Sequence, residues 1–80
     1  MNDIFENEAN HFLDVISANV VKARKEKGFS QLKLAVEMGY SSASYLGRIE
    51  IRKDNEHFNL KQLFKISQIL EVPISSLIDA

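Results

Sequence analysis

Apolar residues recur at spacings of three and four along the whole sequence, and no segment sustains the alternation of a β-strand. That spacing is the period of an α-helix. Gly28, Gly39 and Pro73 interrupt it, and a glycine just after a helical stretch typically ends the helix. The sequence therefore predicts an all-α fold of rather short helices joined by sharp turns.

Five helices are expected. Ser30 and Asn59 are good N-caps for the second and fourth, and Ser41 or Ser42 can cap the third. The polar stretch 53–58 is predicted to be a loop. The expected helices cover residues 10–27, 31–38, 42–52 and 60–70, with a short fifth after Pro73.

The first ten residues precede the first expected helix and form an N-terminal extension. Two alternatives remain open for it. It is a frayed terminus, or its apolar side chains pack on the core or on a partner. Those side chains are Ile4, Phe5 and Phe12.

Length and charge narrow the class of protein. Eighty residues make a single domain, 1–80, with a modest core and no cysteine to reinforce it, so a second subunit is a plausible source of further burial. The overall charge is −1, but residues 15–70 hold all ten Lys and Arg against five acidic residues, a local charge of +5. Such a basic middle suits a nucleic-acid surface despite acidic ends.

Several classes are not expected. No apolar run approaches the roughly 20 residues of a membrane span, and the acidic N-terminus lacks the features of a signal peptide, so we expect a cytoplasmic protein with no membrane contact. His11 and His57 lack partners at metal-ligand spacing, which predicts no metal and no cofactor. No catalytic constellation or glycine-rich phosphate loop is present, so no enzyme is expected.

The segment from Ser30 to Glu50 resembles the Cro/repressor-type helix-turn-helix family, also called the XRE family. The matching residues are Ser30-Gln31, Leu34-Ala35, Gly39 and the run Tyr45-Leu46-Gly47-Arg48-Ile49-Glu50. The resemblance covers about residues 15–79. It implies a compact five-helix, lambda-repressor-like DNA-binding domain whose second and third helices form the helix-turn-helix unit, residues 30–52.

The spacing after Gly39 departs from the family pattern. The family's buried positions would fall on Tyr45 and Arg48, and burying an unpaired arginine is costly. Leu46 and Ile49 fit better. We therefore predict that Ile49 is buried, that Arg48 is exposed, and that the turn holds one extra residue within positions 40–43.

The resemblance assigns DNA contacts on this shifted register. Base edges would meet the start of the third helix, where serine and alanine carry limited information, and Arg48 could bind a guanine or equally well a phosphate. Gln31 and Tyr45 are assigned phosphate contacts that also brace the fold. Arg52 and Lys53 would meet the backbone, unless they are simply solvated charges. The candidate DNA-binding residues are Gln31, Ser41, Ser42, Ala43, Ser44, Tyr45, Arg48, Arg52 and Lys53.

Two further assignments concern structure and assembly. Arg24 and Glu50 resemble a family ion pair that ties the first helix to the end of the third. Dimerisation through the fifth helix would use Ile74, Leu77 and Ile78, although these residues could equally close the core.

The expected function is sequence-specific binding of double-stranded DNA by a small homodimeric transcriptional regulator, of the repressor or restriction–modification controller type. Its operator would be a pseudo-palindrome, because a two-fold dimer reads two half-sites. The alternative is an antitoxin or another protein-binding helix-turn-helix module whose main partner is a protein. The small residues at 42–44 and the acidic ends leave that alternative open.

Overall fold

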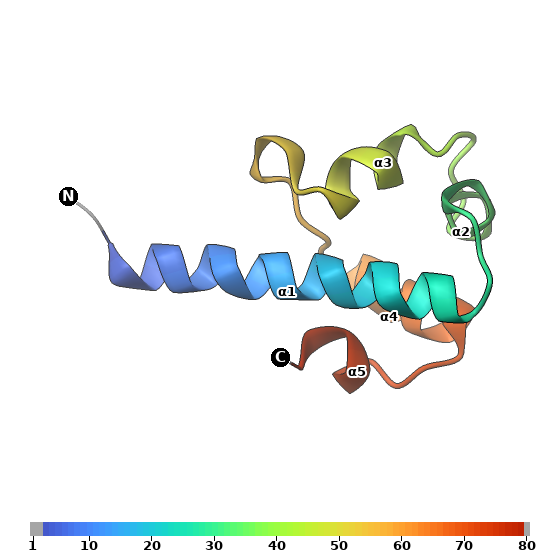
Figure 1. The fold of residues 1–80 in the computed structure, drawn as a ribbon. Helices are drawn as coiled ribbons and strands as arrows, with labels where there is room; N and C mark the ends of the chain where they lie inside the picture. The colour runs from blue at the N-terminus through green and yellow to red at the C-terminus, as the bar shows by residue number, and fades with distance from the viewer. Residues whose placement is uncertain (1–2, 80) are drawn as a thin grey trace.

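A computed structural model describes residues 3–79, and all regular structure within that range is helical. Figure 1 shows α1 as the central helix, with α3 and α5 on opposite sides of it. Five α-helices are present, which confirms the predicted all-α, five-helix fold. Their bounds, with one 3-10 turn η1, are α1 Ile4–Glu26, α2 Gln31–Glu37, α3 Ser44–Glu50, η1 Lys53–Asn55, α4 Leu60–Leu70 and α5 Ser75–Ile78.

Most of the predicted turn signals end and begin the helices. The predicted capping of α3 by Ser41 or Ser42 is wrong, because Ala43 is the N-cap residue and no side-chain capping hydrogen bond is formed there. Gly28 and Gly39 follow α1 and α2 with φ of +80° and +99°, a region that glycine enters without a steric penalty. Ser30 Oγ accepts a hydrogen bond of 3.0 Å from the backbone N–H of Lys33. Asn59 and Gln62 form a reciprocal capping box at the start of α4.

The expected start of α1 at about residue 10 is wrong. Asp3 caps the helix by accepting a 2.9 Å hydrogen bond from the N–H of Phe5, so α1 begins at Ile4. Residues 4–10 are therefore its first turns, and they do not pack on the core, since Ile4, Phe5 and Phe12 are exposed. In Figure 1 this end of α1 extends beyond the rest of the domain. Residues 1–2 of the predicted extension lie outside the described residues.

The core lies between the second half of α1 and the other four helices. Phe58, which was predicted to lie in a polar loop, is buried in it. Leu60 and Phe64 on α4 are exposed although they are apolar. Leu60 lies in the first turn, and Phe64 is rotated about 100° from its buried neighbour Leu63. The buried apolar residues are Ile16, Val20, Leu34, Ala35, Met38, Leu46, Ile49, Phe58, Leu63, Ile66, Leu70 and Leu77.

The short helix α5 closes this core. Leu77 is fully buried, and Asn19 Nδ2 on α1 donates to the carbonyls of Leu77 at 3.1 Å and Asp79 at 2.7 Å. The assignment of Leu77 to a dimer interface is thus wrong, because its side chain is used inside the monomer. Ile74 and Ile78 remain partly accessible. No helix among residues 3–79 is long and apolar enough to cross a bilayer.

The predicted register of α3 is confirmed. Ile49 is 0% exposed and Leu46 is likewise buried, whereas the side chain of Arg48 is 45% exposed. The helix ends at Glu50, two residues before the expected position. Whether the turn is one residue longer than in the family stays a prediction.

Two neighbouring isoleucines provide a test of this register. Ile49→Ala should cost about 2–5 kcal/mol of unfolding free energy, and the milder Ile49→Val about 0.5–1.5 kcal/mol, because each leaves a cavity in the core. Ile51→Ala, at an exposed site, should change it by less than about 0.5 kcal/mol. Urea unfolding followed by circular dichroism measures all three; equal losses at positions 49 and 51 would contradict the register.

Candidate DNA-binding surface

The carboxylate of Glu50, at the C-terminal end of α3, is where three helices meet. Arg24 on α1 donates to it twice, from Nε to Oε2 at 2.8 Å and from Nη2 to Oε1 at 3.0 Å. Gln31 Nε2, at the start of α2, donates to Oε1 at 2.9 Å. The side chains of Arg24 and Glu50 are 8% and 5% exposed. This arrangement fixes the orientation of α3 relative to α1 and α2.

Two further hydrogen bonds strengthen this junction. The third donor of Arg24, Nη1, binds the carbonyl oxygen of Phe29 at 2.9 Å, so the arginine also holds the turn between α1 and α2. Ser17 Oγ on α1 donates to the carbonyl oxygen of Ile49 at 3.2 Å in the buried core. The last turn of α3 is therefore fastened to α1 through both a side chain and the backbone.

The outer face of α3 carries Ser44 and Arg48, and Ile51 follows as the C-cap residue; all three are exposed. These positions are three or four residues apart and so share one side of the helix. Arg48 is held only loosely. Its Nε lies 3.4 Å from Glu56 Oε1, and its guanidinium lies 5.9 Å from the centre of the Tyr45 ring. Its donors can therefore turn outward to another acceptor.

The turn before α3 presents small polar residues. Ser41 and Ser42 are exposed and Ala43, the N-cap residue, is partly buried. Ser42 Oγ lies 3.4 Å from the donating N–H of Ser44 and 3.3 Å from its hydroxyl. Ser42 thus precedes the N-cap residue, and its Oγ accepts a long hydrogen bond from the N–H of Ser44, the first residue of α3.

Tyr40, Tyr45 and Gln62 form a polar cluster beside this turn. The two tyrosine rings stack with centroids 4.8 Å apart, and Gln62 Nε2 donates to both hydroxyl oxygens. Burial raises the pKa of the Tyr45 hydroxyl, an effect that the Gln62 hydrogen bond partly opposes and that Tyr40 and Glu56 reinforce. Both hydroxyls accept from Gln62, and a side-chain hydrogen bond also links Tyr45 to Tyr40.

The structure corrects the role assigned to Arg52. Its side chain is only 8% exposed, and its guanidinium binds α1 through Asp14 Oδ1 at 3.0 Å and Asn10 Oδ1 at 3.1 Å. Nη1 also donates to the carbonyls of Asn55 and Glu56. With these donors engaged, Arg52 stabilises the loop after α3 and is not free to bind phosphate. Lys53, the next residue, is exposed.

Sequence reasoning missed three residues of this surface. Tyr40 and Gln62 lie 22 positions apart, so only the packing of the α4 start against the turn brings them together. Gln62 did carry one signal, since it stands at the third position after the Asn59 cap. Ile51 carries no sequence signal of exposure, because an isoleucine close to the buried Leu46 and Ile49 is typical of a core. It stands three residues after Arg48 and is exposed like Arg48.

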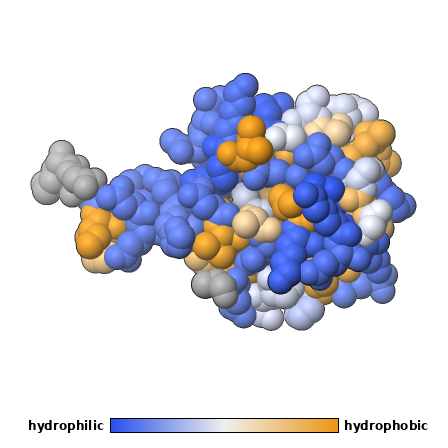
Figure 2. Space-filling view, in the orientation of Figure 1, coloured by the Kyte–Doolittle hydropathy of each residue, from blue (hydrophilic) through white to orange (hydrophobic). Residues whose placement is uncertain are grey.

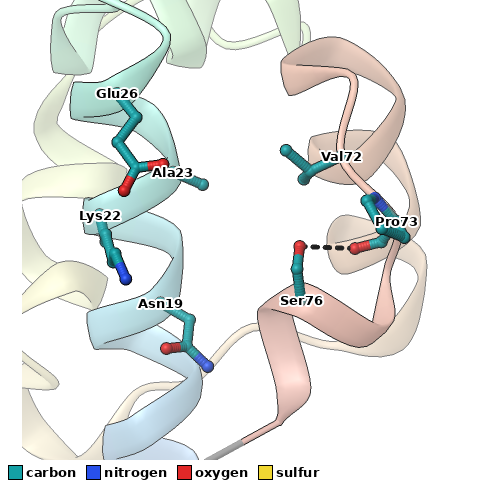
Figure 3. A pocket seen from close by; sticks show the side chains of 7 residues that line it. All are labelled: Asn19, Lys22, Ala23, Glu26, Val72, Pro73 and Ser76. Atoms are coloured by element: carbon teal, nitrogen blue, oxygen red, sulfur yellow. Dashed lines mark hydrogen bonds between the residues drawn. The ribbon is translucent and has the colours of Figure 1, made fainter.

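A groove of about 210 Å³ lies between α1 and residues 72–76, which lead into α5. Figure 3 shows the side chains around it, with Ser76 Oγ donating to the carbonyl oxygen of Pro73 at 2.7 Å. Ligand pockets typically measure about 300–1,000 Å³, so this groove is small. Its lining residues are Asn19, Lys22, Ala23, Glu26, Val72, Pro73 and Ser76. Within residues 3–79, no three His, Cys, Asp or Glu side chains gather as metal ligands would.

The Glu50 junction makes a prediction about stability. Glu50→Ala leaves Arg24 buried without its partner, and breaking a buried pair from one side costs about 3–5 kcal/mol. Glu56→Ala removes the exposed partner of Arg48 and should cost at most about 1 kcal/mol. Thermal melts measure both, and we expect Glu50→Ala to alter folding more than base preference. An unchanged melting temperature for Glu50→Ala would contradict the structural role.

Comparison with known protein families identifies the same architecture. A family model described as helix-turn-helix matches residues 20–77, more than half of the chain. The match runs from the second half of α1 through α2, α3 and α4 into α5. Comparisons with curated proteins and with solved structures gave no match. The chain belongs to the Cro/repressor-type, or XRE, family of helix-turn-helix DNA-binding domains.

Proposed function

We propose that this protein is a sequence-specific regulator of transcription that binds double-stranded DNA as a homodimer, with no enzymatic activity of its own. The observation that carries the proposal is the exposed face of α3, with Ser44 and Arg48, held in place by the Arg24–Glu50–Gln31 junction. A helix fits the major groove of B-DNA, and pre-fixing its orientation lowers the entropic cost of binding. Such a protein acts in the cytoplasm as a repressor or as a restriction–modification controller.

Only a few side-chain atoms on this surface can contact the edges of DNA bases. Arg48 can donate two hydrogen bonds to a guanine, Ser44 can donate or accept, and the methyl groups of Ala43 and Ile51 can contact thymine. Most of these side chains are short. Specificity then rests mainly on Arg48, with contributions from bridging water and from the shape of the duplex.

Phosphate contacts position the helix. Several hydrogen-bond donors lie near the exposed face of α3. They are the hydroxyls of Tyr40 and Tyr45, the exposed serines before α3, and Lys53. Gln31 contributes less to phosphate binding than the sequence suggested, because its side-chain amide already donates to Glu50. Two copies related by a two-fold axis would place their α3 helices in major grooves about 34 Å apart, on a pseudo-palindromic operator.

A protein partner is the second candidate function. The exposed apolar side chains on the first turns of α1, Ile4, Phe5 and Phe12, favour it, because clustered apolar exposure marks protein contacts. An antitoxin would use that surface for its toxin. DNA binding whose affinity falls steeply with salt supports the regulator, whereas salt-independent or undetectable binding supports the protein-binding module.

Arg48 and Lys53 separate base reading from phosphate binding. We expect Arg48→Ala to cost about 1–3 kcal/mol on the operator and to relax preference at one base pair. Lys53→Ala should weaken binding to all duplexes and reduce the salt slope by about 1. Fluorescence anisotropy titrations on operator and scrambled duplexes at several salt concentrations measure both. If Arg48→Ala weakens both duplexes by the same factor, Arg48 reads no base.

The tyrosine hydroxyls give a narrower prediction. A tyrosine hydroxyl is protonated at neutral pH, and the raised pKa of Tyr45 extends that range upward, so its hydroxyl can donate to a phosphate. Tyr45→Phe should therefore weaken operator and scrambled duplexes alike, by about 0.5–1.5 kcal/mol, the size of one hydrogen bond. The titrations use a protein whose fold is checked by circular dichroism. A folded Tyr45→Phe variant with wild-type affinity would exclude that contact.

A further inference from the structure

The first turns of α1, residues 4–14, are called the arm here. The arm lies outside the family match at 20–77, and it extends beyond the rest of the domain in Figure 1. Phe5, Ala9 and Phe12 are exposed and continue, at spacings of four and three, the stripe whose later members Ile16 and Val20 are buried in the core. Figure 2 shows a hydrophobic patch at the outer end of the arm, on an otherwise largely hydrophilic projection. The core-facing stripe of α1 is thus longer than the core that covers it.

The arm is also acidic. Residues 1–21 contain no Lys or Arg, and Glu6 and Glu8 flank the apolar stripe. At the end of the arm, Asp14 already pairs with Arg52 at 3.0 Å. A partner for this surface should therefore combine exposed apolar side chains with uncompensated positive charge.

The outer face of α4 has that combination. Leu60 and Phe64, one turn apart, are 78% and 58% exposed. Lys61 and Lys65 follow them on the helix and are exposed too. The ion pairs among residues 3–79 include neither lysine. The arm cannot reach this face within its own chain, because α1 is one continuous helix that carries the arm away from the domain.

We infer that the arm of one copy docks on the outer face of α4 of a second copy, and that the second arm docks reciprocally on the first. The inference rests on the proposed homodimeric function and names the surfaces that form the dimer. A two-fold axis relates the two contacts, so each copy buries the same pair of patches. Phe5 and Phe12 would cover Leu60 and Phe64, while Glu6 and Glu8 face Lys61 and Lys65. Pairing arm with arm would instead oppose like charges.

Docking of the arm on a second copy would also fix the position of α3. Arg52, two residues after α3, binds Asn10 and Asp14 on the arm and the carbonyls of the following loop. Arg52, Asp54 and Asn55 have positive φ, a backbone conformation that non-glycine residues rarely adopt. The guanidinium thus links the arm to the loop that leaves α3, so an arm fixed by a second copy also fixes where the two α3 helices lie.

Charge reversal provides the test. Variant one carries Glu6→Lys and Glu8→Lys on the arm; variant two carries Lys61→Glu and Lys65→Glu on α4. Sedimentation velocity without DNA should show a wild-type dimer, and each variant alone should dimerise at least about tenfold more weakly because like charges meet. In an equimolar mixture both contacts of the heterodimer pair opposite charges, so dimerisation should return. The matched control, Lys22→Glu with Lys25→Glu, reverses two lysines elsewhere on α1 and should dimerise like the wild type.

The outcomes separate the inference from the function on which it rests. Circular dichroism checks that both variants are folded. A wild-type protein that stays monomeric at every concentration overturns the inference, as does a mixture that stays monomeric. If variant two dimerises like the wild type, the arm does not use α4, which also overturns it. Failure of the wild type to bind DNA overturns the proposed function alone, because the sedimentation experiment contains no DNA.

Discussion

The buried carboxylate of Glu50 is the interaction on which the DNA-binding surface depends. A carboxylate with 5% exposure is stable only if its charge is matched, and Arg24 and Gln31 match it with three hydrogen bonds from two other helices. Neither α2 nor α3 is held rigidly by its own length, since each has only seven residues. Removing the Glu50 carboxylate would therefore loosen the orientation of α3 without removing any exposed side chain of the candidate DNA-binding surface.

Different residues of α3 fix the helix in place and form its exposed face. Its inner residues, Leu46 and Ile49, and its last residue, Glu50, hold the helix, while Ser44 and Arg48 on its outer side and Ile51 just after it are exposed. In the proposed complex with DNA, short side chains on the outer face would let the helix approach the bases closely but would carry little information. In the proposed homodimer, a second copy would double the number of bases read and compensate for this. The acidic, apolar arm and the basic, apolar face of α4 would then form a dimer contact distinct from the surface proposed to meet DNA.

Much of this fold could be predicted from the sequence because local signals decide it. Gly28, Gly39 and the Asn59 cap place helix ends, and the cost of burying Arg48 sets the register of α3. Tertiary packing decides the rest. Leu60 and Phe64 look like core residues until the position of α1 shows which side of α4 is covered. Arg52 looks like a phosphate ligand, but the left-handed loop at residues 52–55 turns its guanidinium onto α1.

The central claim is that two copies of the α3 surface read a two-fold DNA site. Selection of bound duplexes from a random pool by the wild-type protein tests it most directly. We expect enrichment of two inverted half-sites whose centres are about 10–10.5 base pairs, or a multiple of that, apart. A pool that enriches no sequence, even at low salt where phosphate contacts are strongest, would contradict it.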